Sequence, residues 1–279
     1  MRTLIVIPAR YNSKRFPGKP LAMLAGKPIL QRVWDIADSV CHSIADCSAI
    51  VATETPSENC RSERIVDFCR QRQIPVALTS NECRSGSDRV FEVARRHFPS
   101  ADIVVNLQGD VPTCPPYFLT KLIKSLQDSP QASVASVYTS LSWDSLDQLR
   151  ESKKKAPFSG TTVITNKDDM ALWFSKTIIP AIRNEQDFRS TNPTQSPVKR
   201  HIGLYAYRFE ALKFFATTSP GVYESLEQLE QLRFLENGYQ IKMSEVAYPQ
   251  GYEQLTSGID SPDDLARAER IINEYGEII

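Results

Sequence analysis

Four cations lie within ten residues near the start of the chain, at Arg10, Lys14, Arg15 and Lys19. They follow residues 4–7, an apolar β-branched run that predicts a buried strand. Like charges about 4 Å apart repel by about 1 kcal/mol even in water, and open α/β sheets bind ligands at the carboxyl ends of their strands. The position favours a site for a polyanion over the alternative of a solvated basic loop.

A carboxylate that could complement these cations follows another predicted strand. Residues 103–107 form an apolar run, and Gln108, Gly109 and Asp110 come directly after it. In a parallel sheet this end lies at the same edge as the basic loop. Mg²⁺ prefers one or two carboxylates together with phosphate oxygens. Asp110 is therefore a candidate metal ligand, and the alternative is an ordinary solvated turn residue.

The composition places limits on the class of protein. The chain has 279 residues, of which 41% are hydrophobic and 24% charged, as in soluble globular proteins. Lys and Arg balance Asp and Glu at 33 each, so no global field favours nucleic acid or an anionic membrane. No apolar run of about 18 residues is present and no signal peptide is recognisable, which predicts a cytoplasmic protein without a membrane span. The six cysteines show no zinc-binding spacing and are expected to be free thiols.

Helical and strand patterns alternate along the first part of the chain at the spacing of βαβ units, which predicts an α/β fold with a parallel sheet. Ser85, Gly86 and Ser87 precede a predicted helix. Their backbone N–H groups could meet a phosphate or a base edge, or the serine could simply cap the helix.

The second half of the chain carries fewer signals from residue type alone. Residues 199–208 predict a strand with His201 and Tyr205 on one face, and a lone histidine there is commonly structural. Leucines three residues apart predict one amphipathic helix over 226–236. The lysine run 153–155 is expected to be a solvated face, and residues 184–197 a surface loop.

The string P-A-R-Y-N-S-K-R-F-P-G-K at 8–19 resembles the signature of the sugar nucleotidyltransferases, and within them the 3-deoxy-manno-octulosonate (Kdo) cytidylyltransferases, or CMP-Kdo synthetases. Further segments match that family in its order. They are V-N-L-Q-G-D-V-P at 105–112, A-L-W-F-S-K at 171–176, K-R-H-I-G-L-Y-A-Y at 199–207, L-E-Q-L-R at 229–233 and G-I-D-S-P-D-D-L at 258–265.

The resemblance implies a GT-A-like nucleotidyltransferase fold, with a mostly parallel central sheet and a smaller sheet excursion. It implies one domain over 1–279, with a nucleotide-binding half at about 1–130 and a sugar-binding and dimerisation half at about 131–279. The nucleotide-binding residues it implies are Pro8, Ala9, Arg10, Arg15, Lys19, Ser85, Gly86, Ser87, Arg89 and Gln108. The sugar-binding residues it implies are Gln108, Lys176, His201, Tyr205, Glu230 and Gln231. The catalytic residues it implies are Arg15, Lys19, Asp110 and Asp260, of which Asp110 and Asp260 would hold Mg²⁺.

The activity that the resemblance implies is CTP + Kdo giving CMP-Kdo and pyrophosphate, in a cytoplasmic homodimer. The chain departs from the family pattern at Cys83 in place of His, at Lys176 in place of Arg, and at 158–166 and 181–183. Most departures fall in the sugar-binding half. A cytidylyltransferase for another acid sugar, such as 8-amino-Kdo, is therefore an alternative, and a nucleotide-binding homologue without catalysis is a second one.

Overall fold

The protein is described by a computed structural model over residues 1–12, 16–57, 60–253 and 258–278. The chain forms two compact units. The first contains residues 1–124, 204–216 and 248–279, and the second contains 125–203 and 217–247. The boundary at Lys124 lies close to the division predicted near residue 130. Two later segments return to the first unit, and they carry Tyr205 and Asp260.

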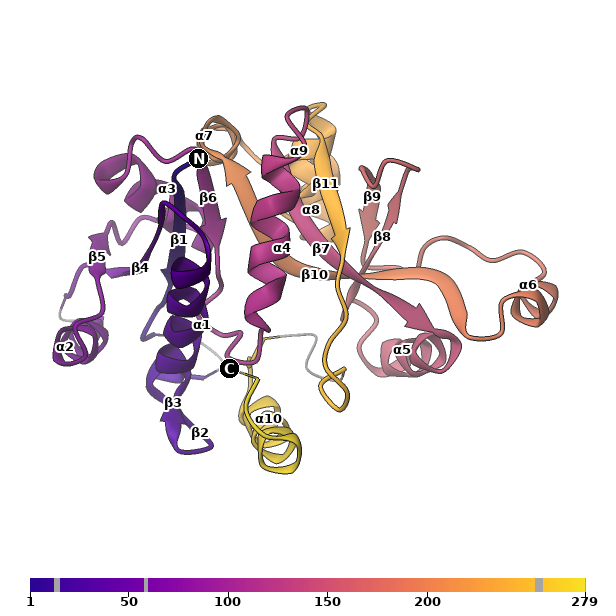
Figure 1. Ribbon diagram of the computed structural model, residues 1–279, viewed down its shortest axis with the longest axis horizontal. Helices are drawn as coiled ribbons and strands as arrows, with labels where there is room; N and C mark the ends of the chain where they lie inside the picture. The colour runs from indigo at the N-terminus through magenta and orange to yellow at the C-terminus, as the bar shows by residue number, and fades with distance from the viewer. Residues whose placement is uncertain (13–15, 58–59, 254–257, 279) are drawn as a thin grey trace. The chain divides into compact units, whose positions relative to one another are not determined.

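The first unit is built on four parallel strands that lie side by side (Figure 1). These strands are β1 (Thr3–Pro8), β4 (Cys47–Glu54), β5 (Val76–Thr79) and β6 (Ile103–Asn106). All six residues of β1 and all four of β6 are buried. Their apolar β-branched composition suits strands covered on both faces, as parallel sheets require. The predicted α/β class with a parallel sheet is confirmed.

The strand order in this unit is β6-β1-β4-β5. The chain moves outward from β1 to β4 and β5, and then returns to add β6 on the other side of β1. This reversal makes the carboxyl ends of β1 and β6 a topological switch point, where open α/β sheets bind ligands. The end of β10 adds an antiparallel edge, with Tyr205 opposite Asn106.

Helices cover the sheet of the first unit, and their contacts follow from their apolar faces. Helix α1 packs on β1 and β4, α2 packs on β4 and β5, and α3 packs on all four parallel strands. The helices of this unit are α1 (Ile29–Ser43), α2 (Glu63–Gln71), α3 (Gly86–His97), α4 (Pro116–Gln127), α7 (Phe209–Thr217) and α10 (Pro262–Tyr275). A short helix η1 (Lys19–Leu21) and a small hairpin of β2 (Met23–Leu24) and β3 (Lys27–Pro28) precede α1.

The second unit combines a parallel strand pair with antiparallel strands. Its strands are β7 (Val134–Ser142), β8 (Thr161–Thr165), β9 (Ala171–Ser175), most of β10 (Gln195–Arg208) and β11 (Ile241–Glu245). Strand β11 pairs parallel to β7, whereas β8 pairs antiparallel to both β9 and β10. Its helices are α5 (Trp143–Lys155), α6 (Glu185–Thr191), α8 (Val222–Glu227) and α9 (Leu232–Glu236).

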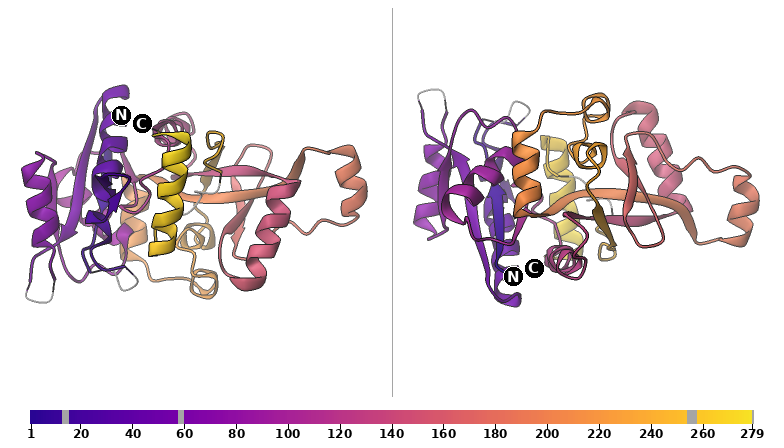
Figure 2. Two further views of the ribbon diagram at one scale, coloured as in Figure 1. Left: turned by 90° about the horizontal axis from the view of Figure 1, so that it is seen from below. Right: turned by 90° about the horizontal axis from the view of Figure 1, so that it is seen from above.

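The polar segment after Trp143 forms the helix α5, which lies beside β10 (Figure 2). Its Trp143, Leu146 and Leu149 pack with Val198 in an apolar cluster. Two predictions of local structure in the second unit are wrong. The predicted loop 184–197 contains helix α6 and the start of β10.

The predicted single helix over 226–236 is interrupted. Gln228 adopts a left-handed backbone with φ 54°, which ends α8 and starts a turn before α9. Leu226 is 74% exposed, so the leucine repeat does not mark one continuous buried face. Periodicity alone cannot reveal such a break, because it depends on contacts made elsewhere in the fold.

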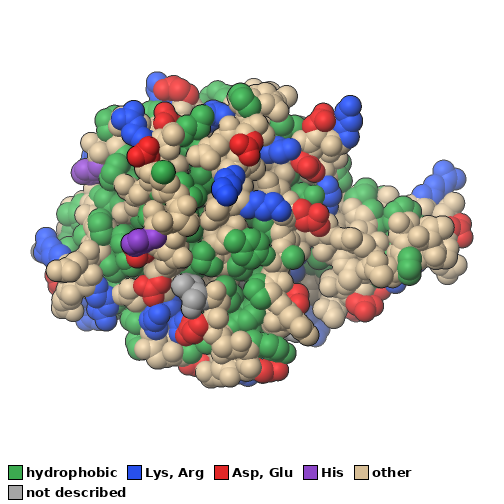
Figure 3. Space-filling model, viewed as in Figure 1, with side chains coloured by type: hydrophobic (Ala, Val, Ile, Leu, Met, Phe, Trp, Pro, Cys, Tyr) green, Lys and Arg blue, Asp and Glu red, His purple; other side chains and the backbone are tan. Residues whose placement is uncertain are grey.

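Lys, Arg, Asp and Glu side chains are interspersed on the face shown in Figure 3, as expected for balanced charge. Across the described residues, the helices are too short or too polar to cross a membrane.

Candidate active site

Lys19 occupies a fixed position at the end of the first loop. Gly18 has φ 74°, a left-handed backbone that glycine adopts without strain, and η1 begins directly after it. The side chain of Lys19 is only 12% exposed. Its Nζ lies 2.7 Å from Asp110 Oδ2 and 3.3 Å from Asp260 Oδ1. The ammonium group therefore bridges two carboxylates that are 150 residues apart in the chain.

The segment with Asp260 is held against Asp110 by backbone contacts. Ile259 donates its N–H to the Asp110 carbonyl at 2.8 Å. A Cβ at Gly258 would lie 2.8 Å from Asp110 Oδ1, so a larger residue would displace that carboxylate. Ser261 caps α10 and forms a capping box with Asp264, which leaves Asp260 just outside the helix.

The loop after β6 packs directly on the end of β1. A Cβ at Gly109 would lie only 2.6 Å from the carbonyl oxygen of Pro8, which is a prohibitive contact. Gly86 at the start of α3 approaches the same region, since a Cβ there would lie 3.4 Å from Gln108 Oε1 and 3.5 Å from Pro8 Cγ. Two glycines thus allow three chain segments to converge at the switch point.

These segments line an open cavity of about 380 Å³ in the first unit. It is lined by Pro8, Ala9, Arg10, Asn12, Lys19, Pro20, Gly86, Gln108, Gly109 and Asp110. The structure therefore brings together seven residues that the resemblance assigns to nucleotide or metal. A volume of this size suits a small-molecule ligand. Cationic Arg10 and Lys19 on its wall suit one that carries phosphates.

Arg10 is oriented by groups from the end of β4 and from the loop before α3. Its Nη2 donates to the Cys83 carbonyl at 2.9 Å, and its Nε lies 3.7 Å from Glu54 Oε1. The Cys83 thiol donates to Glu92 at 3.1 Å. Burial, together with this hydrogen bond, raises the pKa of Cys83 to about 11, so the thiol is protonated at neutral pH. Cys83 in place of His thus ties the loop to α3.

The serines and the arginine predicted beside this cavity face other partners. Ser85 caps α3 and forms a capping box with Asp88. Ser87 is buried and accepts a hydrogen bond from Asn106. Arg89 is fully buried and donates to Thr79. Arg15 lies outside the described residues.

Burial lowers the pKa of Arg89, and the nearby Arg10 cation lowers it further. Glu54 opposes this effect, with Oε1 3.7 Å from Arg89 Nη2. Glu54 therefore lies between the two guanidinium groups. No sequence pattern indicates this role for Glu54, because it ends β4, far along the chain from both arginines.

His201 lies in the interior of the second unit. Its Nε2 is 2.8 Å from Ser136 Oγ, and its ring meets Phe174 edge-on with centroids 4.9 Å apart. Burial lowers the pKa of His201 to about 3, and the positive charge of Lys176 adds to the effect. The imidazole is therefore neutral at physiological pH and acts as a hydrogen-bonding group.

Lys176 follows β9 and is half-buried. Glu227 holds its backbone, because one carboxylate accepts from both Lys176 N and Ser175 Oγ at 2.7 Å. Lys153 Nζ donates to the Lys176 carbonyl at 2.6 Å, and also to the carbonyls of Ser159 and Gly160. The prediction that the lysine run is a solvated face is therefore wrong for Lys153, which binds the segment where the chain departs from the family pattern.

Glu230 and Gln231 lie in the turn between α8 and α9, at positions that the predicted helix did not anticipate. Gln231 is buried and Glu230 is half-buried. Tyr205 and Gln108 belong to the first unit, and the Tyr205 ring is stacked with Tyr207 at 5.9 Å between centroids. Glu227 and Lys153 both bind the backbone of Lys176 and so position it, and no sequence pattern indicates either role.

The acidic pair in the first unit fits a hard divalent cation. Asp110 and Asp260 each place an oxygen within 3.3 Å of one point, which the Lys19 ammonium now occupies. Carboxylate oxygens are the ligand type that Mg²⁺ prefers, and two of them leave room for phosphate and water. No larger group of potential metal ligands occurs in the described parts of the chain.

The fold and this cavity define an open α/β protein with a cationic cavity, suited to a phosphorylated ligand, at the switch point of a parallel sheet. A family model described as Cytidylyltransferase matches residues 4–243. Proteins named 3-deoxy-manno-octulosonate cytidylyltransferase are similar along the whole chain. The one from Maricaulis maris is 37% identical over 279 residues, covering 100% of both chains, and the one from Pseudomonas syringae pv. syringae is 37% identical over 272 residues, covering 96% of this chain and 97% of its own. The chain belongs to the cytidylyltransferase family and, within it, to the 3-deoxy-manno-octulosonate cytidylyltransferases.

Solved structures agree with this assignment. A CMP:2-keto-3-deoxy-manno-octonic acid synthetase complexed with CTP aligns with a TM-score of 0.79 and 31% identity, covering 98% of this chain and 99% of its own. A 4-diphosphocytidyl-2C-methyl-D-erythritol synthase from Anaerococcus prevotii aligns with a TM-score of 0.58 at 13% identity, covering 98% of each chain, and shares the fold. The predicted family and fold class are confirmed.

Proposed function

We propose that the protein transfers CMP from CTP to Kdo, giving CMP-Kdo and pyrophosphate, the activated sugar for lipopolysaccharide or capsule synthesis. The observation that carries this proposal is the Lys19 ammonium held between Asp110 and Asp260 at a cavity with Arg10 on its wall. Anionic and cationic groups are both needed where a metal-bound triphosphate reacts. The names of relatives that are similar over the full chain supply the nucleotide and the sugar.

Arg10 and Lys19 provide the positive charge for the triphosphate. The anomeric hydroxyl of the sugar attacks the α-phosphorus in line, and the bond to the pyrophosphate oxygen breaks. Negative charge grows on the leaving oxygen as this happens, and fixed cations stabilise that charge because they need no reorganisation. Arg15 is expected to contribute in the same way. Pro8, Ala9, Gly86 and Gln108 form further parts of the wall for the nucleotide.

Asp110 and Asp260 would hold Mg²⁺. When bound, the ion supplies Lewis-acid polarisation of a phosphate oxygen and lowers the pKa of a coordinated hydroxyl. The chain itself keeps the two carboxylates together through the contact of Gly258 and Ile259 with Asp110.

We assign the acid sugar to Lys176, His201, Glu230 and Gln231, which all belong to the second unit. Lys176 provides a cation for the sugar carboxylate. Neutral His201 provides a hydrogen bond for a hydroxyl, and the amide and carboxylate of Gln231 and Glu230 suit the remaining hydroxyls.

Pyrophosphate release measured with CTP and Mg²⁺, with and without Kdo, tests this proposal. We expect release to depend on Kdo and to fall by about 100-fold or more in Asp110→Ala, since a metal-binding carboxylate is lost. Asp102→Asn is a matched control, because Asp102 precedes the same strand and binds the N–H of Arg2 at its other end. Kdo-independent release, or full activity in Asp110→Ala, would contradict the proposal. Binding of CTP without any turnover would indicate the non-catalytic alternative.

A different acid sugar such as 8-amino-Kdo is the second candidate substrate. The observation that favours it is the Lys153 ammonium bound to the carbonyls of Ser159, Gly160 and Lys176, in a segment that departs from the family pattern. Turnover of CTP with a panel of acid sugars compares the candidates, and a higher kcat/KM for another sugar would replace Kdo in the proposal.

A homodimer and a cytoplasmic location stay predictions for this chain. Val222 and Leu226 lie one turn apart on α8 and are 68% and 74% exposed. Apolar side chains that gather on a surface mark interaction sites, which supports the dimer.

A further inference from the structure

Two cysteines meet at the amino end of the sheet in the first unit, away from the cavity described above. Cys41 lies in the last turn of α1, and Cys47 is the first residue of β4. Their sulfur atoms are 3.3 Å apart, and the Cys41 thiol donates to the Cys47 sulfur. A disulfide requires about 2.05 Å between sulfurs. The two atoms therefore need to approach by only about 1.3 Å to form a bond.

The surroundings of the other four cysteines differ. The thiols of Cys60 and Cys83 donate to the carboxylates of Glu54 and Glu92. Cys69 and Cys114 are buried. Within the described residues, which include all six cysteines, Cys41 and Cys47 are the one pair in sulfur-to-sulfur contact. Both are partly exposed, so small reagents can reach them.

The contact between the two thiols distinguishes their reactivity. The hydrogen bond from Cys41 lowers the pKa of Cys47, whereas holding that proton raises the pKa of Cys41. A thiolate attacks a disulfide, and a thiol does not. Cys47 is therefore the attacking group, and Cys41 is positioned to resolve the product.

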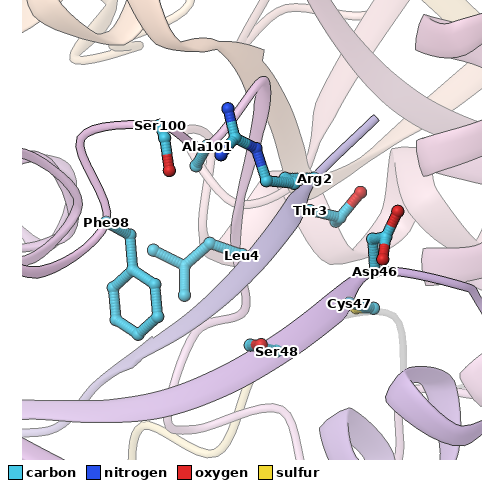
Figure 4. A pocket seen from close by; sticks show the side chains of 9 residues that line it. All are labelled: Arg2, Thr3, Leu4, Asp46, Cys47, Ser48, Phe98, Ser100 and Ala101. Carbon is cyan, nitrogen blue, oxygen red and sulfur yellow. The ribbon is translucent and has the colours of Figure 1, made fainter.

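A hollow of about 260 Å³ opens beside Cys47 (Figure 4). Backbone and side chains around β1 and β4 line it, including those of Arg2, Asp46 and Phe98. Cys47 lines this space, which is open to a small disulfide, and Arg2 on the same lining offers a cation to a carboxylate that such a molecule carries.

We propose that Cys41 and Cys47 form a reversible dithiol–disulfide site that reacts with low-molecular-weight disulfides such as oxidised glutathione. The Cys47 thiolate attacks one sulfur of the reagent, which forms a mixed disulfide and releases the first thiol. Cys41 then loses its proton and attacks the Cys47 sulfur, which forms the internal disulfide and releases the second thiol. The two protein thiols are oxidised, and one reagent disulfide is reduced to two thiols.

The bond would connect the end of α1 to the start of β4 across residues 42–46. A cross-link restricts the unfolded chain, so the oxidised form should melt at a higher temperature than the reduced form. Glu54, which contacts Arg10 at the active-site cavity, lies at the opposite end of β4. The site is thus independent of the proposed transfer reaction.

The experiment treats the folded protein with oxidised glutathione, quenches it with acid and digests it without reductant using a protease that cleaves before Asp. Cleavage before Asp38, Asp46 and Asp67 separates Cys41, in residues 38–45, from Cys47, in residues 46–66. We expect these two fragments to remain joined, with a mass two hydrogens below their sum, and to separate on reduction. Because Cys60 also lies in 46–66, Cys60→Ser is the matched control and should keep the cross-link.

Two variants test the order of attack. Cys41→Ser should accumulate glutathione on Cys47, because no thiol remains to displace it. Cys47→Ser should form no cross-link. Glutathione should add to its Cys41 more slowly than it adds to Cys47 in Cys41→Ser. The proposal would be overturned if fragments 38–45 and 46–66 of the treated wild-type protein were not joined. It would also be overturned if Cys60→Ser abolished the cross-link. Absence of the adduct on Cys47 in Cys41→Ser would overturn the assigned order.

Discussion

At the scale of single residues, His201 shows how the surroundings determine the chemistry of a side chain. Ser136 and Phe174 enclose the ring, and the cation of Lys176 opposes protonation. A buried imidazole gains little from solvent when it is charged, so the neutral form dominates. A histidine in this state can hold a hydroxyl of a sugar at neutral pH without exchanging its proton.

Protonation of His201 should destabilise the fold in acid. The pKa is about 3 in the folded protein and 6.5 in the reference state, so the unfolded chain binds more protons between these values and stability falls as pH is lowered through this window. We expect His201 to lower the free energy of unfolding by about 2 kcal/mol between pH 7.5 and pH 5. Urea unfolding at both pH values measures it. His201→Gln should reduce the pH dependence by this amount, and an unchanged dependence would contradict the assignment.

At the scale of elements, a buried ion pair shapes the turn that carries Glu230 and Gln231. Glu224 in α8 receives two hydrogen bonds from Arg233 in α9, at 2.7 Å and 2.6 Å. Glu236 of α9 also accepts the N–H groups of Tyr223 and Glu224 at the start of α8, at 3.0 Å each. These contacts favour two short helices side by side over one long helix, although the leucine spacing suits the latter.

Breaking this pair should destabilise the protein strongly. Glu224→Gln leaves Arg233 buried without its charged partner, and such a loss typically costs about 3 kcal/mol or more. Chemical denaturation measures it. Glu210→Gln removes a carboxylate from an exposed pair with Lys213 and should cost less than about 1 kcal/mol. Equal effects of the two substitutions would show that the buried pair does not hold the turn.

At the scale of the whole molecule, the assigned functions divide between the two compact units. The described residues of the phosphate cavity, with Asp260, belong to the first unit, whereas Lys176, His201, Glu230 and Gln231 belong to the second. This division should make binding of the nucleotide separable from contacts to the sugar.

CTP with Mg²⁺ should therefore raise the melting temperature through the first unit. A ligand at 100 times its Kd stabilises a protein by about 2.7 kcal/mol. We expect Lys19→Met to abolish most of this shift, because it removes a cation from the cavity wall. Glu224→Gln, in the second unit, should start from a lower melting temperature and keep the CTP-induced shift. Calorimetric scans with and without CTP decide this, and loss of the shift in both variants would contradict the division.

Much of the first unit could be predicted because local signals and fold agree there. The apolar run at residues 4–7 forms β1, and the run at 103–107 forms β6. Because parallel strands place the loops after β1 and β6 at one edge of the sheet, the fold class alone predicts that these loops lie close together. The meeting of Lys19 with Asp110 follows from that topology, whereas Asp260 was expected beside Asp110 only because of the resemblance.

The second unit was less predictable because contacts distant in sequence override its local patterns. The Lys153 ammonium donates to four carbonyls of residues later in the chain, which no charge pattern indicates. The Glu224–Arg233 pair favours the break at Gln228, and Glu227 accepts hydrogen bonds from Ser175 Oγ and Lys176 N. These partners become visible only when the chain is folded.

The bridge from Lys19 to Asp110 and Asp260 has a practical consequence for handling the purified protein. The chain supplies its own counter-ion to the acidic pair, so the two carboxylates do not repel each other when divalent ions are stripped away. Dialysis against a chelator should therefore leave the protein native, and restoring magnesium should return full activity without a refolding step.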